Sequence, residues 1–441
     1  SLPTTPAGFS PSAQDLRFLR MLSRQTWAFF DRYVSPENNW LPPDNVQEVP
    51  KLTIAHRTSP TNMGMALLSH LAAHDFGYLS GGRLLERITA MLESMAGLER
   101  HQGHFYNWYD TKTLQPLAPR YLSTVDSGNL AGMLLTLRPG LLGLIDTPLF
   151  DRSTLSGLGD TLDVLQQALE GVNLDDRAVL ELRVKVESAL VQDTPDNLLP
   201  LLDLTAALTI DSPPRAAEEA HYWLQALQAQ CMDLRAERLL FELPSAPARD
   251  KPPALTLRQM AELDCTLWLP ADQAQVQEVQ RLARARIIHL EHLAEFCASL
   301  ASMDFTFLYD AQRDLFSIGY NADERRLDHG YYDLLASEVR LTNFVAIAQG
   351  QLPQQAWFTL GRLLSNNRGG PVLLSWSGSM FEYLMPNLIM PPCRSSMGTS
   401  WASPGACPSR VITPSTPTSI ISTGPSAFQA LGSCAGWPRT P

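Results

Sequence analysis

The 441-residue sequence is poor in charge and in paired cysteines. Charged residues make up 18% of the chain, below the roughly 25% that is usual in soluble domains. The net charge is -11 and no run of clustered Lys and Arg occurs, whereas nucleic-acid phosphates require such clusters. None of the 6 cysteines forms a Cys-x-x-Cys pair, which argues against a zinc ribbon and favours reduced thiols. We therefore expect no nucleic-acid partner, no metal and no cofactor.

Long apolar runs and strand patterns are also scarce. No stretch of about 18 uncharged apolar residues, the length that a membrane-spanning helix needs, is found, so we expect no membrane segment in this chain. Hydrophobic residues still make up 45%, enough for a sizeable core. The aromatic stretches 104–109 and 305–318 fit loops or small hairpins rather than a large sheet. The sequence thus favours an all-α fold.

Helix signals cover most of the chain. Apolar residues recur on one helix face from Ala13 to Val34, and Ser35-Pro36 ends that helix, because Pro disfavours the α conformation before it. Ser59-Pro60 begins a second helix, since Ser is a good N-cap and Pro fits the first helical position. A third helix is expected from Gly82 to Arg100. Ser127 is predicted to cap a helix over Leu130–Leu137.

Composition divides the chain into four parts. Residues 1–137 and 291–390 place aromatic and acidic loops between helices, as expected at the mouth of a sugar-binding α-barrel. Residues 138–290 are rich in helix formers and poor in aromatics, which predicts a helical insertion or linker. After Glu382 the sequence contains no Asp or Glu. Residues 391–441, dominated by small and polar residues, are predicted to be an aberrant, disordered tail.

Glu338 is the first candidate for chemistry. Glycoside cleavage needs two carboxylates, one to protonate the leaving oxygen and one to attack or to activate water. Glu338 follows Tyr331-Tyr-Asp-Leu-Leu-Ala-Ser and is predicted to lie on an otherwise apolar helix, where burial would raise its pKa toward that of a useful acid. The alternative is a structural pairing of Glu338 with Arg340.

Three further clusters are candidates for sugar binding. Trp376 offers a stacking face and Glu382 an acceptor for hydroxyl groups, or the segment is a buried aromatic turn. Asn107, Trp108 and Asp110 form a sugar platform or a packed aromatic loop. Asp126 binds ligand or caps the helix that follows it.

Histidines and nucleophiles give weaker signals. His70 and His74 lie four residues apart on a predicted helix, but no third metal ligand is near them in sequence, so a structural pair is favoured. No Gly-x-Ser-x-Gly motif indicates a serine nucleophile.

Six motifs together resemble the glucoamylase-like central region of cyclic β-1,2-glucan synthases. They are His56-Arg-Thr-Ser-Pro-Thr-Asn, Gly103-His-Phe-Tyr-Asn-Trp-Tyr-Asp-Thr, Tyr121-Leu-Ser-Thr-Val-Asp-Ser-Gly-Asn-Leu-Ala-Gly, Phe316-Ser-Ile-Gly-Tyr-Asn, Tyr331-Tyr-Asp-Leu-Leu-Ala-Ser-Glu and Ser375-Trp-Ser-Gly-Ser-Met-Phe-Glu-Tyr-Leu-Met-Pro. The resemblance covers about Ala13 to Met390, and so many long motifs in order are highly specific.

The resemblance implies an (α/α)6 toroid and a retaining transglycosylase that closes linear β-1,2-glucan into rings. Full-length relatives are large membrane-embedded proteins, which places this region in the cytoplasm or at the cytoplasmic face of the bacterial inner membrane. By motif match, Glu338 is one of two catalytic Glu residues, as nucleophile or as acid/base. The predicted substrate-binding residues are Glu382, Trp376, Tyr332, Tyr320, Asp110, Trp108, Asn107, Asp126 and Arg340.

The C-terminal part departs from that family. The second catalytic Glu of the family lies in a Trp-Gly-Ile-Ser-Glu-Ser-Gly-Tyr motif, which this sequence lacks. We interpret the residues beyond about Pro391 to Arg394 as that region translated out of frame, which resequencing of the coding DNA would test. The toroid is then incomplete at its C-terminal end and its activity impaired. A glucan-binding module without catalysis, a β-1,2-glucan hydrolase and a helical scaffold segment are the alternatives.

Overall fold

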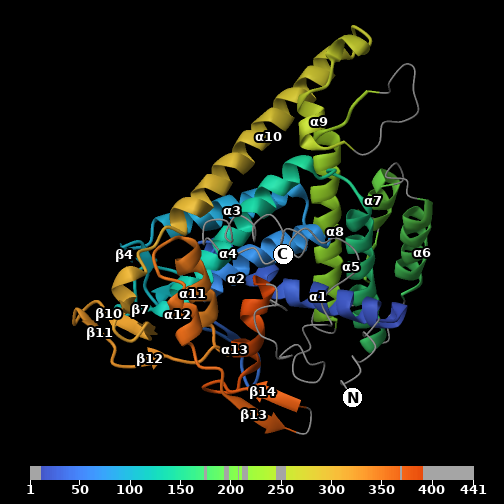
Figure 1. The fold of residues 1–441 in the computed structure, drawn as a ribbon. Helices are drawn as coiled ribbons and strands as arrows, with labels where there is room; N and C mark the ends of the chain where they lie inside the picture. Colours follow the sequence, from blue (N-terminus) through green and yellow to red (C-terminus); the bar gives the residue numbers. More distant parts are fainter. Residues whose placement is uncertain are drawn as a thin grey trace, which may run out of the picture.

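The computed structural model describes most of the chain, and helices dominate it (Figure 1). The described residues are 11–172, 176–192, 198–206, 208–210, 217–244, 255–367 and 370–390. The predicted tail, 391–441, lies outside the described residues.

The helices follow one another with few strands between them. The α-helices are α1 Ala13–Tyr33, α2 Pro60–Asp75, α3 Gly81–Ala96, α4 Thr124–Gly143, α5 Arg152–Gly171, α6 Arg177–Gln192, α7 Leu198–Ala206, α8 Glu218–Leu240, α9 Leu257–Ala261, α10 Gln273–Leu300, α11 Val339–Ala348, α12 Gln355–Thr359 and α13 Met380–Leu384. Short 3₁₀ helices are η1 Pro36–Asn38, η2 Leu144–Asp146, η5 Cys265–Leu267, η6 Thr306–Leu308 and η7 Met385–Leu388.

The strands are short and form small antiparallel sheets in the loops. Their bounds are β1 Val46–Gln47, β2 Thr53–Ile54, β3 Arg57–Thr58, β4 Arg100–His101, β5 His104–Phe105, β6 Tyr109–Asp110, β7 Tyr121–Ser123, β8 Tyr309–Asp310, β9 Leu315–Ser317, β10 Gly319–Asn321, β11 Arg326–Leu327, β12 Tyr331–Tyr332, β13 Leu364–Asn367 and β14 Gly370–Leu373. The sheets have the orders β1-β2, β3-β6, β4-β5, β11-β10-β7, β12-β9-β8 and β13-β14. The prediction of small hairpins in place of a large sheet is confirmed.

Helix ends follow the predicted capping signals in two places and depart from them in a third. Ser59 caps α2, its Oγ accepting from the Asn62 amide at 3.2 Å, with Pro60 as the first helical residue. Helix α1 ends just before Ser35-Pro36, as predicted. Ser127, however, is buried inside α4, which Ser123 caps instead. Strand β7 ends at Ser123, paired with Gly319, so the chain turns into the helix one turn earlier than predicted.

Helix α4 is the centre of the main core. It packs against α2, α10 and α11, and its glycines allow close approach: a Cβ on Gly128 would lie 2.0 Å from Thr342 Oγ1, and one on Gly140 2.4 Å from Leu71 Cδ2. Among the described residues, the span Thr124–Asp146 is long and apolar enough to cross a membrane, and 61% of its most apolar window is buried inside the structure. That burial is what a core helix requires.

The helices around α4 form two layers. Helices α2, α4 and α11 bury residues on nearly all sides, whereas α3 has one apolar face and packs against α2 and α10. An inner layer of buried helices with an outer layer of amphipathic ones is the arrangement of an α/α toroid, so the predicted all-α class is confirmed and the helix order agrees with part of such a ring. Figure 1 shows the long helix α10 running past α3 and α4.

A second core lies in the middle of the chain. Helices α5, α6, α7 and α8 pack together around Leu158, Leu165 and Leu227, and α1 contributes Ala28. The predicted boundaries at residues 137 and 290 both fall inside helices, α4 and α10, which pack against each other in the main core. This second cluster of buried apolar residues therefore draws on α5 to α8 together with α1.

We predict that Gly128→Ala destabilises the protein by about 1–3 kcal/mol. The added methyl group meets the backbone and side chain of Thr342, so α4 and α11 must move apart, and overpacking of a core has this cost. The matched control is Gly143→Ala at the exposed end of α4, where a Cβ meets nothing within 4 Å; it should be neutral or slightly stabilising. Urea denaturation measures both, and equal stabilities would contradict the close contact.

Candidate active site

Glu338 lies where a loop turns into a helix. It is the N-cap residue of α11, half-buried, and its Oε1 accepts a hydrogen bond from Asn129 Nδ2 at 2.9 Å. Glu338 was predicted to lie on an otherwise apolar helix; α11 is apolar, but Glu338 is its N-cap residue and not an interior residue. Tyr331 and Tyr332 form β12, which pairs with Ser317 and Phe316 of β9, so α11 starts only after the chain has left that sheet.

The surroundings of Glu338 favour its protonated form by raising its pKa. Burial raises the pKa of Glu338 to about 7, and the charges of Asp126 and Glu382 add to this effect while the Asn129 hydrogen bond opposes it. Burial, together with the charges of Glu338, Asp126 and Glu382, also raises the pKa of Tyr332. The carboxylates of Asp126 and Glu382 therefore act through their charges on both Glu338 and Tyr332. The predicted rise in the pKa of Glu338 is therefore present, although Glu338 lies at the start of a helix and not inside one.

Asp126 is held in the first turn of α4. Its Oδ1 accepts from the Thr61 hydroxyl at 2.6 Å. With its amide oriented to satisfy both neighbours, Asn107 donates to Asp126 Oδ2 at 3.2 Å and accepts from Trp108 Nε1 at 3.2 Å. The Arg57 guanidinium stacks over the Trp108 ring, with 4.3 Å from Cζ to the ring centroid. Asn107 and Trp108 are thus joined to the carboxylate cluster through Asp126.

Glu382 is an acceptor for its own loop. It closes a capping box at the start of α13, and its carboxylate accepts from the amide and hydroxyl groups of Ser377 and Ser379 at 2.5–3.3 Å. Burial alone would raise the pKa of Glu382, but these hydrogen bonds outweigh it and lower that pKa. The turn presents Trp376, whose side chain is 65% exposed. Glu382 thereby fixes the segment that carries an open aromatic face.

Two of the predicted substrate-binding residues, Asp110 and Tyr320, take part in other contacts. Asp110 Oδ1 accepts from the backbone amides of Lys112 and Thr113 at 2.8 and 2.9 Å and so stabilises a turn. Tyr320 stacks on His101, with ring centroids 5.4 Å apart.

Arg340 is buried, with 2% of its surface exposed. Its Nη2 donates to the Tyr383 carbonyl at 2.7 Å and to Asn387 Oδ1 at 3.2 Å. Glu338 takes part in none of the ion pairs found within the described ranges. Arg340 therefore connects α11 to α13 and η7 instead of neutralising Glu338.

Two residues of this site were missed from the sequence. Asn129 and Thr61 are both buried and link Glu338 to Asp126. A signal existed: Asp126 and Asn129 are three residues apart, on one face of a helix. Ordinary core polarity and site polarity look alike in a sequence, so the spacing alone did not distinguish them.

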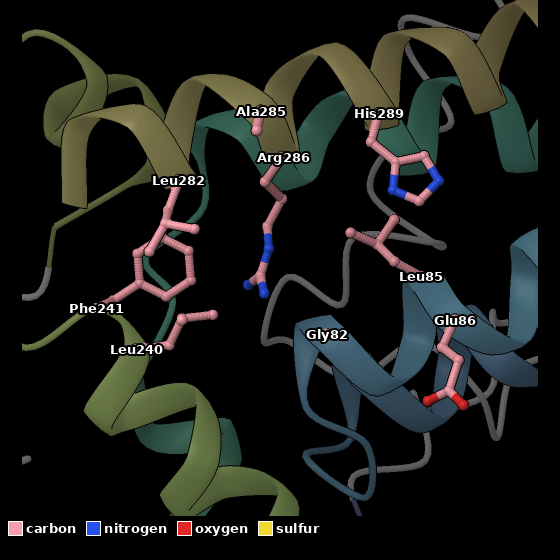
Figure 2. A pocket seen from close by; sticks show the side chains of 9 residues that line it. All are labelled: Gly82, Leu85, Glu86, Leu240, Phe241, Leu282, Ala285, Arg286 and His289. Atoms are coloured by element: carbon pink, nitrogen blue, oxygen red, sulfur yellow. The ribbon is translucent and has the colours of Figure 1, made fainter. Parts of the chain in front are cut away.

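A separate cavity of about 380 Å³ lies between α3, α8 and α10 (Figure 2). Leu85, Phe241 and Leu282 supply apolar walls, and Arg286 enters from α10. Arg286 pairs with Glu237, which also accepts from the Gly81 amide at 2.8 Å. None of the predicted site residues lines this cavity, and its charged residues Arg286 and Glu86 are already paired, so it is not the candidate active site.

We predict that Glu338→Gln stabilises the protein at pH 8 by about 1–2 kcal/mol, after allowance for partial exposure. With a folded pKa near 7 against an unfolded value of 4.5, the folded state binds the extra proton between these values. Ionisation therefore removes stability as pH rises through that window, and the amide avoids this loss. Denaturant titrations at pH 4.5 and pH 8 measure the effect, which should be small at the lower pH.

The opposite sign is expected for Glu382→Gln, which serves as the matched control. Because the folded pKa of Glu382 is lowered, its charge contributes stability above pH 4.5 that the amide loses, about 1–3 kcal/mol for charged hydrogen bonds. Stabilisation by both variants at pH 8 would contradict the two assigned environments.

No family model matches the chain. Over 380 residues, 86% of this chain, it is 35% identical to the cyclic β-(1,2)-glucan synthase NdvB of Rhizobium meliloti (strain 1021), and it spans 13% of that protein's length. Crystal structures of glucoamylase-like proteins from Bacteroides fragilis and Bacteroides caccae align at 12% identity with TM-scores of 0.39 and 0.38, covering 88% and 85% of this chain and 62% and 61% of theirs. The family resemblance predicted from the motifs is confirmed, and the chain is a relative of one segment of the cyclic β-(1,2)-glucan synthases.

Proposed function

We propose that this chain is a glycoside transglycosylase region that acts on linear β-1,2-glucan to form cyclic β-1,2-glucan. The similarity to a cyclic β-(1,2)-glucan synthase supports the substrate class. The observation that carries the chemistry is Glu338, a half-buried carboxyl with a pKa near 7 beside Asp126 and Tyr332. In the longer proteins this region would work at the cytoplasmic face of the bacterial inner membrane.

Glu338 suits the proton-transfer role. A general acid works best when its pKa lies near the operating pH, because it is then protonated and can still release its proton. In a retaining transfer, the acid protonates the leaving glycosidic oxygen while a second carboxylate attacks the anomeric carbon. The hydroxyl at the other end of the glucan then attacks that carbon, returns its proton to Glu338 and closes the ring.

The second carboxylate is the weak point of this chain. The oxygens of Asp126 accept from Thr61 and Asn107, and Glu382 is engaged by the serines of its own turn. A carboxylate held in this way is a poor nucleophile, because attack would leave its donors without an acceptor. Together with the absence of the Trp-Gly-Ile-Ser-Glu-Ser-Gly-Tyr motif from the sequence, this supports an impaired activity.

Two other functions use the same residues. A β-1,2-glucan hydrolase would pass the sugar to water, and a non-catalytic glucan-binding module would use Trp376 and Trp108 without turnover. Products separate these alternatives: rings indicate transfer, short linear sugars indicate hydrolysis, and retained binding with no product indicates a binding module.

We predict that Glu338→Gln lowers the weak activity on linear β-1,2-glucan by about 100-fold or more, as loss of a general acid does. The chain, this variant and a version with the reading frame restored after residue 390 are incubated with the glucan, and products are followed by mass spectrometry. The restored chain should be the most active, since it regains the second Glu. Equal, measurable activity in the chain and its Glu338→Gln variant would remove Glu338 from the mechanism.

We also predict that Trp376→Ala weakens glucan binding by roughly tenfold, the loss of about 1–2 kcal/mol that truncation of an aromatic contact gives. Trp376 is exposed on the turn that Glu382 holds. Trp268, which follows η5 at the far end of α10, is the matched control, and Trp268→Ala should bind as the parent chain does. Calorimetric titration with linear oligosaccharides measures both, and an equal affinity for both variants would place the sugar elsewhere.

A further inference from the structure

A chain of hydrogen bonds joins Glu338 to Asp126. Asn129 Nδ2 donates both to Glu338 Oε1 at 2.9 Å and to Thr61 Oγ1 at 3.1 Å. The Thr61 hydroxyl donates in turn to Asp126 Oδ1 at 2.6 Å. Asn129 is fully buried and Thr61 is 8% exposed, so neither group can exchange these partners for water. Three helices contribute: α2 carries Thr61, α4 carries Asn129, and α11 begins after Glu338.

The direction of these bonds is fixed. A hydroxyl has one proton, and Thr61 gives it to Asp126, so its oxygen has to accept from Asn129. The amide of Asn129 must then turn its NH₂ group toward both Thr61 and Glu338. Its Oδ1 is buried and has no hydrogen-bond partner among the described residues. Leaving a buried carbonyl without a hydrogen bond costs free energy. In this orientation both N–H groups of Asn129 donate, one to Thr61 Oγ1 and one to Glu338 Oε1.

We propose that Asn129, oriented by Thr61 and Asp126, is a positioning residue that holds the carboxyl of Glu338 for proton transfer. The proposal rests on the function proposed above and adds two residues to its machinery. Without Thr61, the Asn129 amide could rotate and present its oxygen to Glu338. That oxygen could only accept a hydrogen bond from the protonated carboxyl, so the neutral form of Glu338 would be stabilised instead of the ionised form.

The charges that face Glu338 oppose this hydrogen bond. Asp126 from α4 and Glu382 from α13 raise the pKa of Glu338, and Tyr332 from β12 is a further titratable group coupled to it by charge. The Asn129 bond has a larger effect on Glu338 than either carboxylate and lowers its pKa. Removing the Asn129 donor should therefore raise the pKa of Glu338 and make it a weaker acid.

The test is a ¹³C NMR titration of the Glu338 carboxyl in the full chain, assigned by its loss in Glu338→Gln. Asn129→Ala should lower the acid dissociation constant of Glu338 by roughly tenfold, since a hydrogen bond to the charged form is lost. Asn343→Ala is the matched control. Asn343 is a buried asparagine of α11 whose Nδ2 donates to the Val339 carbonyl at 3.2 Å and not to Glu338. It should leave the Glu338 titration unchanged.

A second pair of variants covers a failure of Asn129→Ala to fold. Thr61→Val keeps the shape and removes the hydroxyl, whereas Thr61→Ser keeps the hydroxyl. Thr61→Val should shift the Glu338 titration in the same direction as Asn129→Ala, and Thr61→Ser should not. An unchanged titration in folded Asn129→Ala, or equal titrations in the two Thr61 variants, would overturn the proposal. So would an equal shift in Asn343→Ala.

The titration needs no substrate, so it separates this inference from the proposed function. If no variant and no parent chain acts on β-1,2-glucan while the titrations shift as expected, the proposed reaction fails and the positioning role of Asn129 stands. With activity present, the acid limb of the pH profile of kcat/KM should move with the NMR titration in Asn129→Ala. A limb that stays in place would show that Asn129 does not act through Glu338.

Discussion

The contact between α4 and α11 at Gly128 is the constraint on which the site depends. Thr342 occupies the space that a side chain at position 128 would need, so the two helix backbones approach as closely as glycine permits. This approach lets Asn129, one residue further along α4, reach the carboxyl at the start of α11. Any larger residue at position 128 would separate the proton-carrying group from the helix that orients it.

Glu338 and Glu382 differ in acidity, and neither takes part in an ion pair found among the described residues. Glu382 accepts several hydrogen bonds from its own turn and ionises readily, whereas Glu338 receives one from Asn129 and is otherwise buried. Pairs of carboxyls whose environments push their pKa values apart are the usual mark of a division between acid and acceptor roles. Here the difference arises from the burial of Glu338 and from the larger number of donors to Glu382. Arg340, the nearest basic residue in sequence, joins α11 to α13.

The sequence was sufficient for features set by neighbouring residues and insufficient for those set by distant ones. The start of α2 could be predicted because Ser59 and Pro60 carry the capping signal themselves. The place of Glu338 could not, because β12 exists only by pairing with β9, some fifteen residues earlier in the chain. Asn129 was overlooked for the same reason: its role depends on Thr61 and Glu338, which come from other helices. The motif resemblance pointed to Glu338 without requiring its local structure.

The hydrogen bond from Asn129 also influences which oxygen of the neutral Glu338 carboxyl carries the proton. An amide N–H directed at Oε1 favours that oxygen as the carbonyl oxygen, which is the better acceptor, so the neutral carboxyl carries its hydrogen preferentially on Oε2. In the proposed reaction the hydrogen would pass to a sugar oxygen from the Oε2 side, since Asn129 of α4 lies at Oε1. A glucan chain would have to arrive with its glycosidic oxygen on the Oε2 side, which restricts the orientation of a productive complex before any sugar hydroxyl is recognised.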